Sequence, residues 1–253
     1  MATTKQPVFF ISHGGPDLLE NKGLPGTFYS WFGALLKNEL KPKAIVIISA
    51  HWQGKGRTGI YDVASKVIHL LNKANIKAEG KKYGNDHGVW VPLKRAMKSN
   101  PDIPIVEVST FEHEDMEAHI KLGQALAPLR DEGVVIIGSG SAVHNLRELW
   151  HNMGKPSPKY VMDFDKEMET IAVGLTGEER AVAATKLNHH PAFRPSHPTA
   201  EHLMPFHIAL GAAGEDKGEK LLEDYIATLA WGSYSFGLNE QHTKKSPYQT
   251  SFL

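Results

Sequence analysis

Residues 46–52 read VIISAHW and residues 9–16 read FFISHGGP. In both stretches a run of strand-forming apolar residues ends at a serine, and a histidine follows that serine directly or after one residue. Two further runs are equally rich in Val and Ile and equally continuous. Because apolar residues do not alternate with polar ones, all four runs predict strands that are covered on both faces. The four runs are Pro7–Ile11, Ala44–Ser49, Ile103–Ser109 and Val134–Gly138.

Stretches with a helical spacing of apolar residues separate these strands and follow the last of them. They predict helices over residues 27–40, 63–71, 90–97, 116–130, 160–175 and 178–187. Alternating strands and helices predict an α/β fold, with a central, mostly parallel or mixed sheet covered by helices on both faces. We expect one domain over residues 1–238, followed by a polar C-terminal tail over residues 239–253. In such sheets ligands bind beyond the carboxyl ends of the strands.

The composition restricts the partners of the protein. The 253 residues contain 28 Lys and Arg and 28 Asp and Glu, so no broad field attracts nucleic acid or an anionic membrane. No run of about 18 apolar residues is present and the first residues are too polar for a signal peptide, so we expect a cytoplasmic protein. Without cysteine, a transition metal would have to be bound by imidazole and carboxylate groups. The 14 histidines are therefore the candidate imidazole ligands of such a metal.

The histidines after the first two strands, His13 and His51, occupy equivalent positions. The turn Gly14-Gly15-Pro16 follows His13 and lets the backbone bend sharply. Either histidine alone could simply cap a loop by hydrogen bonding. Because the carboxyl ends of neighbouring parallel strands meet at one edge of a sheet, both rings together indicate a site at that edge.

Two more histidines are candidates for the same edge. His144 lies in GSGSAVHNLR after the fourth strand, where we expect the start of a helix. The spacing of the glycines matches neither the dinucleotide-binding fingerprint nor the P-loop. His87 lies between Asp86 and a short helix, where it is either a turn residue or a pocket residue.

Residues 188–207, NHHPAFRPSHPTAEHLMPFH, contain five histidines. Thr199 is a plausible N-cap that would put Glu201 and His202 in the first turn of a helix. Adjacent helical residues point about a hundred degrees apart, so one of the two would bind a metal and the other would support it. The remaining four histidines are more simply polar loop residues: His189, His190, His197 and His207.

Five motifs in this order resemble the LigB-type class III extradiol ring-cleavage dioxygenases, in the branch that includes 4,5-DOPA dioxygenase. The resemblance runs from about residue 8 to about residue 236. The motifs are SHGGP, SAHW, DHGVWVPL, ALAPLRDEGVVIIGSGSAVHNLR and HPTAEHLMPFHIALGAA.

The resemblance implies a single α/β domain with a metal, Fe(II) or Zn(II), at the carboxyl edge of the sheet. The implied ligands are His13, His51 and His202, with Glu201 as the alternative third ligand. His144 is implied as the catalytic acid and base or, in zinc-loaded forms, as a fourth ligand. His87 is implied as a catalytic-pocket residue near the substrate. The implied reaction inserts dioxygen into a small, DOPA-like catechol and gives a ring-opened semialdehyde; a homo-oligomer is compatible with this reading.

One departure from the family pattern concerns the pocket. Family members carry roughly two dozen further residues between the motif that matches SAHW and the helix that matches residues 63–71, and here Trp52 leads directly into QGKGRTGIYD. The absent segment is expected to form part of the pocket wall. Two alternatives therefore stay open: a metal-binding family member that has lost ring cleavage, and a metal-dependent hydrolase that uses a metal-bound hydroxide.

Overall fold

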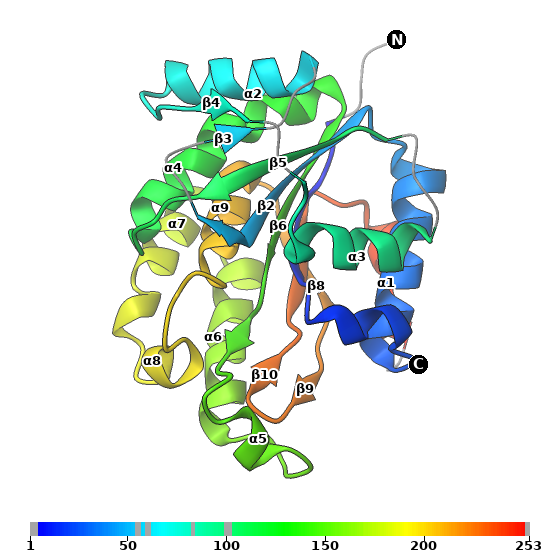
Figure 1. The fold of residues 1–253 in the computed structure, drawn as a ribbon, viewed down its shortest axis with the longest axis vertical. Helices are drawn as coiled ribbons and strands as arrows, with labels where there is room; N and C mark the ends of the chain where they lie inside the picture. The colour runs from blue at the N-terminus through cyan, green and yellow to red at the C-terminus, as the bar shows by residue number, and fades with distance from the viewer. Residues whose placement is uncertain (1–4, 54–56, 59–61, 82–83, 99–102, 251–253) are drawn as a thin grey trace.

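The computed structural model describes residues 5–53, 57–58, 62–81, 84–98 and 103–250. In this part of the chain, the four predicted strands lie side by side and parallel at the centre of one sheet, in the order β5-β2-β6-β1 (Figure 1). Their bounds are β1 Val8–Ser12, β2 Ala44–Gln53, β5 Ile105–Thr110 and β6 Val134–Gly140. The predicted α/β fold is confirmed, and every predicted strand is present.

Strands that the sequence did not reveal extend this sheet on both sides and make it mixed. β11 (Ser233–Phe236) pairs antiparallel with β1, and β8 (Gly218–Leu222) pairs antiparallel with β11. On the other side β3 (Arg57–Thr58) runs antiparallel to β5 and is followed by β4 (Glu79–Gly80). Among the described residues the order is therefore β4-β3-β5-β2-β6-β1-β11-β8, with eight strands.

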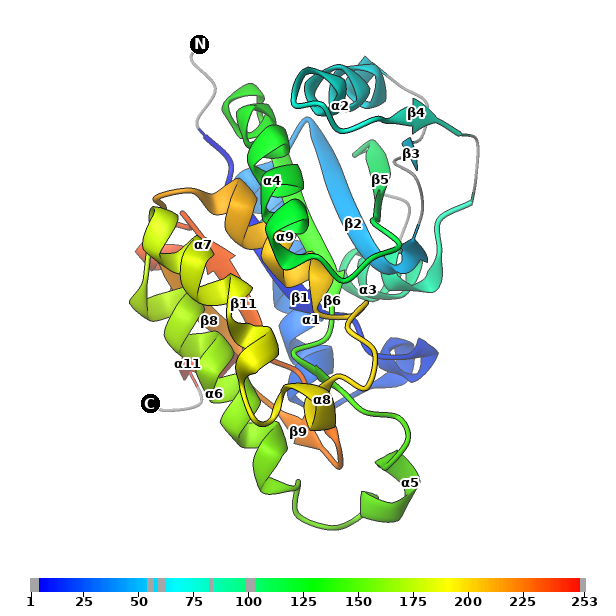
Figure 2. The same cartoon turned by 90° about the vertical axis from the view of Figure 1, so that its left-hand side faces the viewer.

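Helices cover both faces of the sheet, as the continuous apolar strands predicted (Figures 1 and 2). On one face, α1 (Leu24–Ala34) and α3 (His87–Met97) pack on alternate strand residues such as Phe9 and Ile47. On the other face, the intervening residues pack against five helices. These are α2 Asp62–Lys73, α4 Met116–Leu126, α6 Lys159–Gly174, α7 Gly177–Thr185 and α9 Met204–Ala213. Both sides of each central strand are thus buried.

Several helix ends differ from the prediction. The stretch 27–40 continues from α1 into a wider turn, η2 (Leu35–Leu40), and stops at Lys41, which has a left-handed φ of 43° just before Pro42. The stretch 116–130 changes after α4 into the tighter turn η3 (Ala127–Glu132), which contains Pro128. The remaining short helices are η1 Pro16–Glu20, α5 Leu149–Asn152, η4 Leu187–His189 and α8 Phe193–Ser196.

The predicted N-cap at Thr199 is wrong. Thr199 lies in a bend, residues 201–203 form a turn, and α9 begins only at Met204, with Pro205 in its first turn. Thr199 instead donates its hydroxyl hydrogen bond to Glu201 Oε1 over 3.0 Å. Glu201 and His202 therefore lie outside the helix, so the helical angle between adjacent residues does not apply to them.

The described part of the predicted polar tail folds back onto the domain. Asn239 accepts a hydrogen bond from Gln241 N and caps α10 (Glu240–Thr243), which precedes α11 (Pro247–Thr250). Thr243 and Ser246 are buried, and Gln249 Nε2 donates to the carbonyl oxygen of Lys220 over 3.1 Å. The end of the tail, residues 251–253, lies outside the described residues. A domain boundary at residue 238 remains a prediction.

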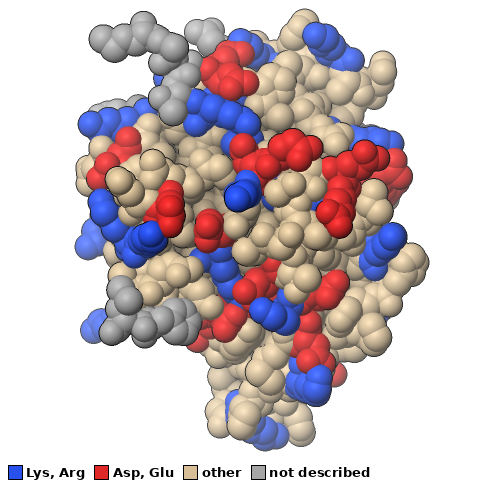
Figure 3. All heavy atoms as spheres, turned by 180° about the vertical axis from the view of Figure 1, so that it is seen from behind, with Lys and Arg blue, Asp and Glu red and all other residues tan. Residues whose placement is uncertain are grey.

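The surface carries charges of both signs. On the face shown in Figure 3, Lys and Arg side chains are interspersed with Asp and Glu side chains. Within the described ranges, no helix is both long and apolar enough to cross a membrane.

Two buried histidines in this fold make stability depend on pH. His119 Nε2 accepts from Phe111 N and its Nδ1 faces the carbonyl oxygen of Asp115, so the ring is neutral. Burial lowers the pKa of His119 and of the equally buried His207 to about 4. The unfolded chain, with a histidine pKa near 6.5, takes up these protons first. The contribution of each neutral ring to the free energy of unfolding is therefore fully present above pH 6.5. It is lost as the pH falls toward 4, and the loss amounts to about 3 kcal/mol for each ring.

Urea unfolding of the metal-free protein between pH 7 and pH 4.5 measures this loss. The decrease in unfolding free energy with falling pH should be smaller in His207→Gln than in the unchanged protein. It should be unaltered in His69→Gln, because His69 is exposed on α2. An unfolding free energy that stays constant over this pH range would contradict the prediction.

Candidate metal centre and active site

Three histidine rings from distant parts of the chain meet at the carboxyl edge of the parallel strands. His13 directly follows β1, His51 lies near the end of β2, and His202 lies in the turn before α9. The Nε2 atom of His51 is 2.9 Å from His13 Nε2 and 3.3 Å from His202 Nε2. Two main-chain hydrogen bonds hold the segments together at the end of β6: His13 N donates to Gly140 O, and Ser141 N donates to His202 O. The three rings therefore converge at one edge of the sheet, as predicted.

Hydrogen bonds determine the protonation pattern of two of these rings. Ser139 Oγ donates to the carbonyl oxygen of Gly88, so it accepts from His13 Nδ1, 3.0 Å away. His202 Nδ1 lies 3.1 Å from Glu201 Oε1 and donates to it, because a carboxylate oxygen can only accept. In both rings the Nε2 lone pair is consequently free and directed at the centre of the cluster.

The geometry fits a bound divalent ion. Two imidazole nitrogens that bind one ion at about 2.1 Å are themselves about 3.0 to 3.4 Å apart, close to the separations observed here. Burial, together with the neighbouring histidines, lowers the pKa of His13 and of His202 well below the ordinary value, and lowers that of His51 to about 4. Neutral rings are the form that binds metal, so all three are ready as ligands at neutral pH. These residues form one group that could hold a metal ion.

The segment Asp86-His87-Gly88 shapes the wall behind these rings. Asp86 is the N-cap of α3: its Oδ1 accepts from Gly88 N over 2.7 Å and from Ser49 Oγ over 2.8 Å. A Cβ atom on residue 88 would lie 2.5 Å from Ser49 Oγ and 3.1 Å from carbon atoms of the His13 and His51 rings. Only glycine fits there. Ser49 and Gly88 were not among the predicted site residues, although a glycine in the first turn of a helix is a visible signal in the sequence.

His144 lies in a short strand and not at the start of a helix. β7 (Val143–His144) pairs with β10 (Leu229–Ala230), and α5 begins only five residues after His144 because Asn145 Oδ1 caps an intervening turn. The ring stacks on that of His202, with centroids 3.5 Å apart and planes 14° from parallel. His144, Glu201 and His202 form a second group that could hold a metal ion. The stacking disfavours it, because a nitrogen lone pair lies in the plane of its ring and two nearly parallel rings point their lone pairs side by side. Burial lowers the pKa of His144, and the nearby Glu201 opposes this shift.

His87, the first residue of α3, also borders the cluster. Its ring centroid is 3.7 Å from that of His51 and 5.9 Å from that of His13. It belongs to neither of the groups that could hold a metal ion among the described residues. This location agrees with the pocket position that the family resemblance implied.

The turn that carries His144 is held through the main chain of Ala142. Ser12 Oγ accepts from Ala142 N over 3.1 Å and donates to Gly232 O, while His197 Nε2 donates to Ala142 O over 2.9 Å. His197 is therefore a fully buried structural residue and not a polar loop residue.

The other histidines of residues 188–207 are not part of the cluster. His207 was also expected in a polar loop, but it is fully buried in α9 and faces the carbonyl oxygens of Leu203 and Ala184. His189 is exposed at the end of η4, and His190 is partly buried.

A cavity of about 300 Å³ opens beside the histidines. Gly14, with a left-handed φ of 59°, lies against the ring of Trp231, where a Cβ atom would be only 2.1 Å from a ring carbon. The lining residues are Ser12, His13, Gly14, Gly15, His51, His87, Ser141, His144, Leu146, His202, Leu229, Ala230 and Trp231. Apart from imidazoles, hydroxyls, the unpartnered indole N–H of Trp231 and main chain, the wall is apolar.

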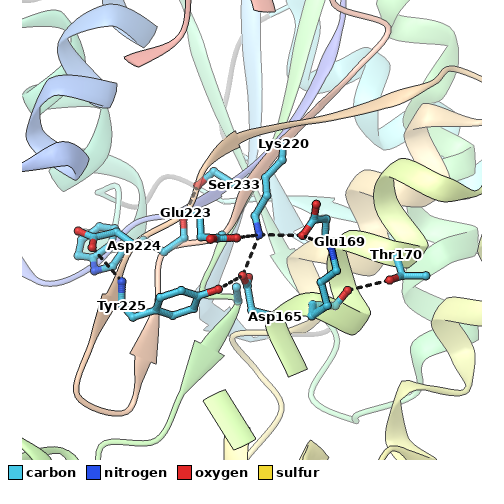
Figure 4. A network of polar contacts seen from close by, with 12 residues as sticks. Asp165, Glu169, Thr170, Lys220, Glu223, Asp224, Tyr225 and Ser233 are labelled. Atoms are coloured by element: carbon cyan, nitrogen blue, oxygen red, sulfur yellow. Dashed lines mark hydrogen bonds and ion pairs between the residues drawn. The ribbon is translucent and has the colours of Figure 1, made fainter. Parts of the chain in front are cut away.

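A buried polar network anchors the hairpin that supplies this apolar wall. β9 (Tyr225–Ile226) pairs with β10, and the Tyr225 hydroxyl donates to Asp165 Oδ2 on α6 over 2.9 Å (Figure 4). Lys220 on β8 contacts the same carboxylate oxygen at 2.9 Å, as well as Glu169 and Glu223. Since Lys220 and Asp165 are almost completely buried, the network fixes the hairpin between α6 and β8.

Comparison with known proteins now identifies the family. The sequence model of the catalytic LigB subunit of aromatic ring-opening dioxygenase matches residues 57–237. The chain belongs to the LigB family. Two LigB relatives in plants are each named 4,5-DOPA dioxygenase extradiol. The Beta vulgaris protein is 36% identical, with 90% of this chain and 95% of that protein covered. The Portulaca grandiflora protein is 31% identical, with 90% and 94% covered.

A solved structure has a similar fold. The crystal structure of an uncharacterized protein from Escherichia coli K12 is similar, with a TM-score of 0.78 and 30% sequence identity, and covers 92% of this chain and 100% of that one. His13 and His51 precede the stretch that the LigB model matches.

The relatives also contain residues that this chain lacks. The alignment with the Beta vulgaris protein extends over 262 residues, more than the 253 of this chain, so some positions have no counterpart here. The departure noted after Trp52 falls mostly on residues 54–56 and 59–61, which lie outside the described residues. His51, just before them, is the exposed member of the three-histidine cluster.

The hydrogen bond between Glu201 and His202 leads to a prediction about metal affinity. Carboxylates that accept from the second nitrogen of a metal-binding imidazole orient it and raise its basicity, and their loss costs roughly 10- to 100-fold in affinity. We therefore expect Glu201→Gln to bind Zn(II) or Fe(II) more weakly by this factor, measured by competition with a chromogenic chelator. Glu178→Gln, an exposed carboxylate on α7, is the matched control. An unchanged affinity in Glu201→Gln would show that this carboxylate does not support the site.

Proposed function

We propose that the protein is a metal-dependent extradiol dioxygenase that opens the ring of a small catechol and gives a ring-opened semialdehyde. In this proposal His13, His51 and His202 hold the metal, His144 is the catalytic acid and base, and His87 contacts the substrate. The observation that carries the proposal is the convergence of three imidazole Nε2 atoms on one point beside an apolar cavity, in a member of the LigB family.

The side chains of the protein would bind and orient the catechol. Ser139 and Glu201 keep His13 and His202 in the tautomer that presents Nε2 to the centre. Leu229 and Trp231 offer the flat ring an apolar surface and exclude water from one side of it. A ferrous ion bound by the three rings would supply a Lewis acid for the catechol oxygens and the redox chemistry with dioxygen.

His144 is the best-placed base for the substrate. Its ring lines the cavity, and its stacking on His202 favours a role beside the ion over a role as a fourth ligand. In the proposed reaction it takes the proton of a catechol hydroxyl and later returns a proton to the opened product. Both atoms of dioxygen enter the product, so the reaction needs no further reductant. The lowered pKa of His144 favours the neutral ring, which is the form that accepts the first of these protons.

The names of the relatives support a DOPA-like catechol as the substrate class. A second candidate, a metal-binding protein that has lost ring cleavage, draws support from the exposed position of His51 and from the residues that only the relatives have. One experiment separates the two candidates.

Purified protein is loaded with Fe(II) under anaerobic conditions, mixed with a catechol and then exposed to air. The proposed function predicts oxygen uptake in equal amount to a yellow ring-opened product. Zinc-loaded protein should give neither, because zinc has no redox chemistry. Tight catechol binding without oxygen uptake in the iron-loaded protein would favour the second candidate.

A further inference from the structure

We infer that Glu107 on β5 is a positioning residue of the active site, whose carboxyl group keeps its proton and donates a hydrogen bond to Asp86. Asp86 in turn holds the two segments that carry His51 and His87. The inference rests on the proposed function and deepens it, because His51 is a proposed ligand and His87 a proposed substrate contact. Glu107 does not line the cavity and belongs to neither possible metal-ligand group among the described residues. It is nevertheless only 6% exposed, and a buried glutamate needs a partner.

Two carboxyl groups lie side by side behind the histidines. Glu107 is in register with Ile47 on β2, so its side chain lies on the face of the sheet that α3 covers. There the main-chain N of Asp86 donates to Glu107 Oε2 over 3.4 Å. The Oδ2 atom of Asp86 is buried, and no donor contacts it among the described residues. Two adjacent carboxylates repel each other, so one of the two groups retains its proton.

The contacts assign this proton to Glu107. Asp86 Oδ1 already accepts from Ser49 Oγ and from Gly88 N, and the N-terminus of α3 favours a negative charge on its N-cap residue. Burial, together with the hydrogen bond to the Asp86 side chain, raises the pKa of Glu107 to about 9. A protonated carboxyl group is a donor, so Glu107 supplies the hydrogen bond that Asp86 Oδ2 otherwise lacks.

Asp86 connects this hydrogen bond to both segments of the active site. Its contact with Gly88 N fixes the first turn of α3, which begins at His87. Its contact with Ser49 Oγ fixes the end of β2, because the same hydroxyl accepts from His51 N over 3.2 Å. Without the donor from β5, Asp86 Oδ2 would stay buried and unpaired, a cost that a shift of Asp86 toward water relieves. Such a shift would release both segments.

The first test compares two substitutions of similar size. Glu107→Gln keeps a donor, because its amide nitrogen can donate to Asp86 as the protonated carboxyl group does, whereas Glu107→Leu removes the donor. We expect the Zn(II) affinity of Glu107→Gln to stay within about threefold of the unchanged protein and that of Glu107→Leu to fall about tenfold. Competition of the metal-free proteins with a chromogenic chelator measures both affinities. If Glu107→Leu does not fold, Glu107→Met gives the same comparison, because its flexible apolar side chain adapts to the space.

The second test detects the proton itself. Carboxyl groups with an ordinary pKa are ionised at pH 7. The infrared difference spectrum between the unchanged protein and Glu107→Gln at this pH should therefore contain the C=O stretch of a protonated carboxyl group. Glu178→Gln, which replaces the exposed carboxylate on α7, is the matched control and should lose only carboxylate bands.

The outcomes separate this inference from the proposed function. The protonated band together with rescue by glutamine supports the inference, and neither measurement requires ring cleavage. Iron-loaded protein that consumes no oxygen would overturn only the proposed function. A difference spectrum with carboxylate bands alone would overturn the inference, and so would equal Zn(II) affinities in the apolar and the glutamine variants. Absence of any Zn(II) binding in the unchanged protein would overturn both.

Discussion

Replacing His13, His51 or His202 by alanine is expected to remove bound metal almost completely. The three Nε2 atoms converge on one point, with His51 Nε2 2.9 Å from His13 Nε2 and 3.3 Å from His202 Nε2. A site with two ligands holds a divalent ion poorly against water, so each variant should lose affinity by on the order of a hundredfold or more. Metal content after dialysis, measured by mass spectrometry, checks this for each variant.

His69→Ala, on the exposed side of α2, is the matched control and should keep its metal. One result would reassign a ligand: full metal content in His202→Ala together with loss in Glu201→Ala. The third ligand would then be the carboxylate, as in the alternative that the family resemblance left open.

Replacing His144 by alanine is expected to abolish turnover while leaving most of the metal bound. A positioned acid and base contributes roughly 10² to 10⁴ to the rate, so kcat should fall by that factor. The stacked arrangement of His144 on His202, and the absence of His144 from the group formed by His13, His51 and His202, are the physical reasons for expecting the metal to stay. Oxygen uptake by iron-loaded protein gives kcat, and metal analysis of the same sample gives occupancy.

His87→Ala is the useful comparison for this variant. Its ring borders His51 but does not belong to the ligand group, so we expect a larger effect on KM than on metal content. If His144→Ala instead loses metal as fully as His13→Ala, His144 is a fourth ligand in the resting protein. His144 would then be assigned as a metal ligand, as in zinc-loaded forms, and not as the catalytic acid and base.

The central strands and the edge that holds the site were predictable because they follow local rules. Strands buried on both faces need apolar residues at every position, and β1, β2, β5 and β6 have them. Parallel strands share one carboxyl edge, so histidines placed just after two of them had to lie close together. The clustering of His13 and His51 was predictable for the same reason, and the family motifs added His202; that the three rings bind a metal remains a proposal.

The outer strands were not predictable from local pattern. β8 contains Lys220, whose burial is possible only because Asp165 and Glu169 reach it from α6, more than 50 residues away in the sequence. A lysine in a strand predicts exposure unless its partners are known. β7 and β10 are each two residues long, too short for any periodicity to show.

The buried histidines were misjudged for a similar reason. His197 and His207 look like polar loop residues because the sequence does not show that they are buried. His197 donates to Ala142 O, and His207 faces Ala184 O as well as the local Leu203 O; only the folded chain brings Ala142 and Ala184 to these rings. Thr199 failed as an N-cap because its hydroxyl is used by Glu201, two residues later.

The most direct measurement of the proposed metal centre is a crystal structure of the Fe(II)-loaded protein with an anomalous map recorded at the iron absorption edge. We expect one strong peak bound by the Nε2 atoms of His13, His51 and His202 at about 2.1 Å from each, with His144 outside its ligand sphere. A peak bound through Glu201 without His202, or one located away from these three rings, would contradict the proposed centre.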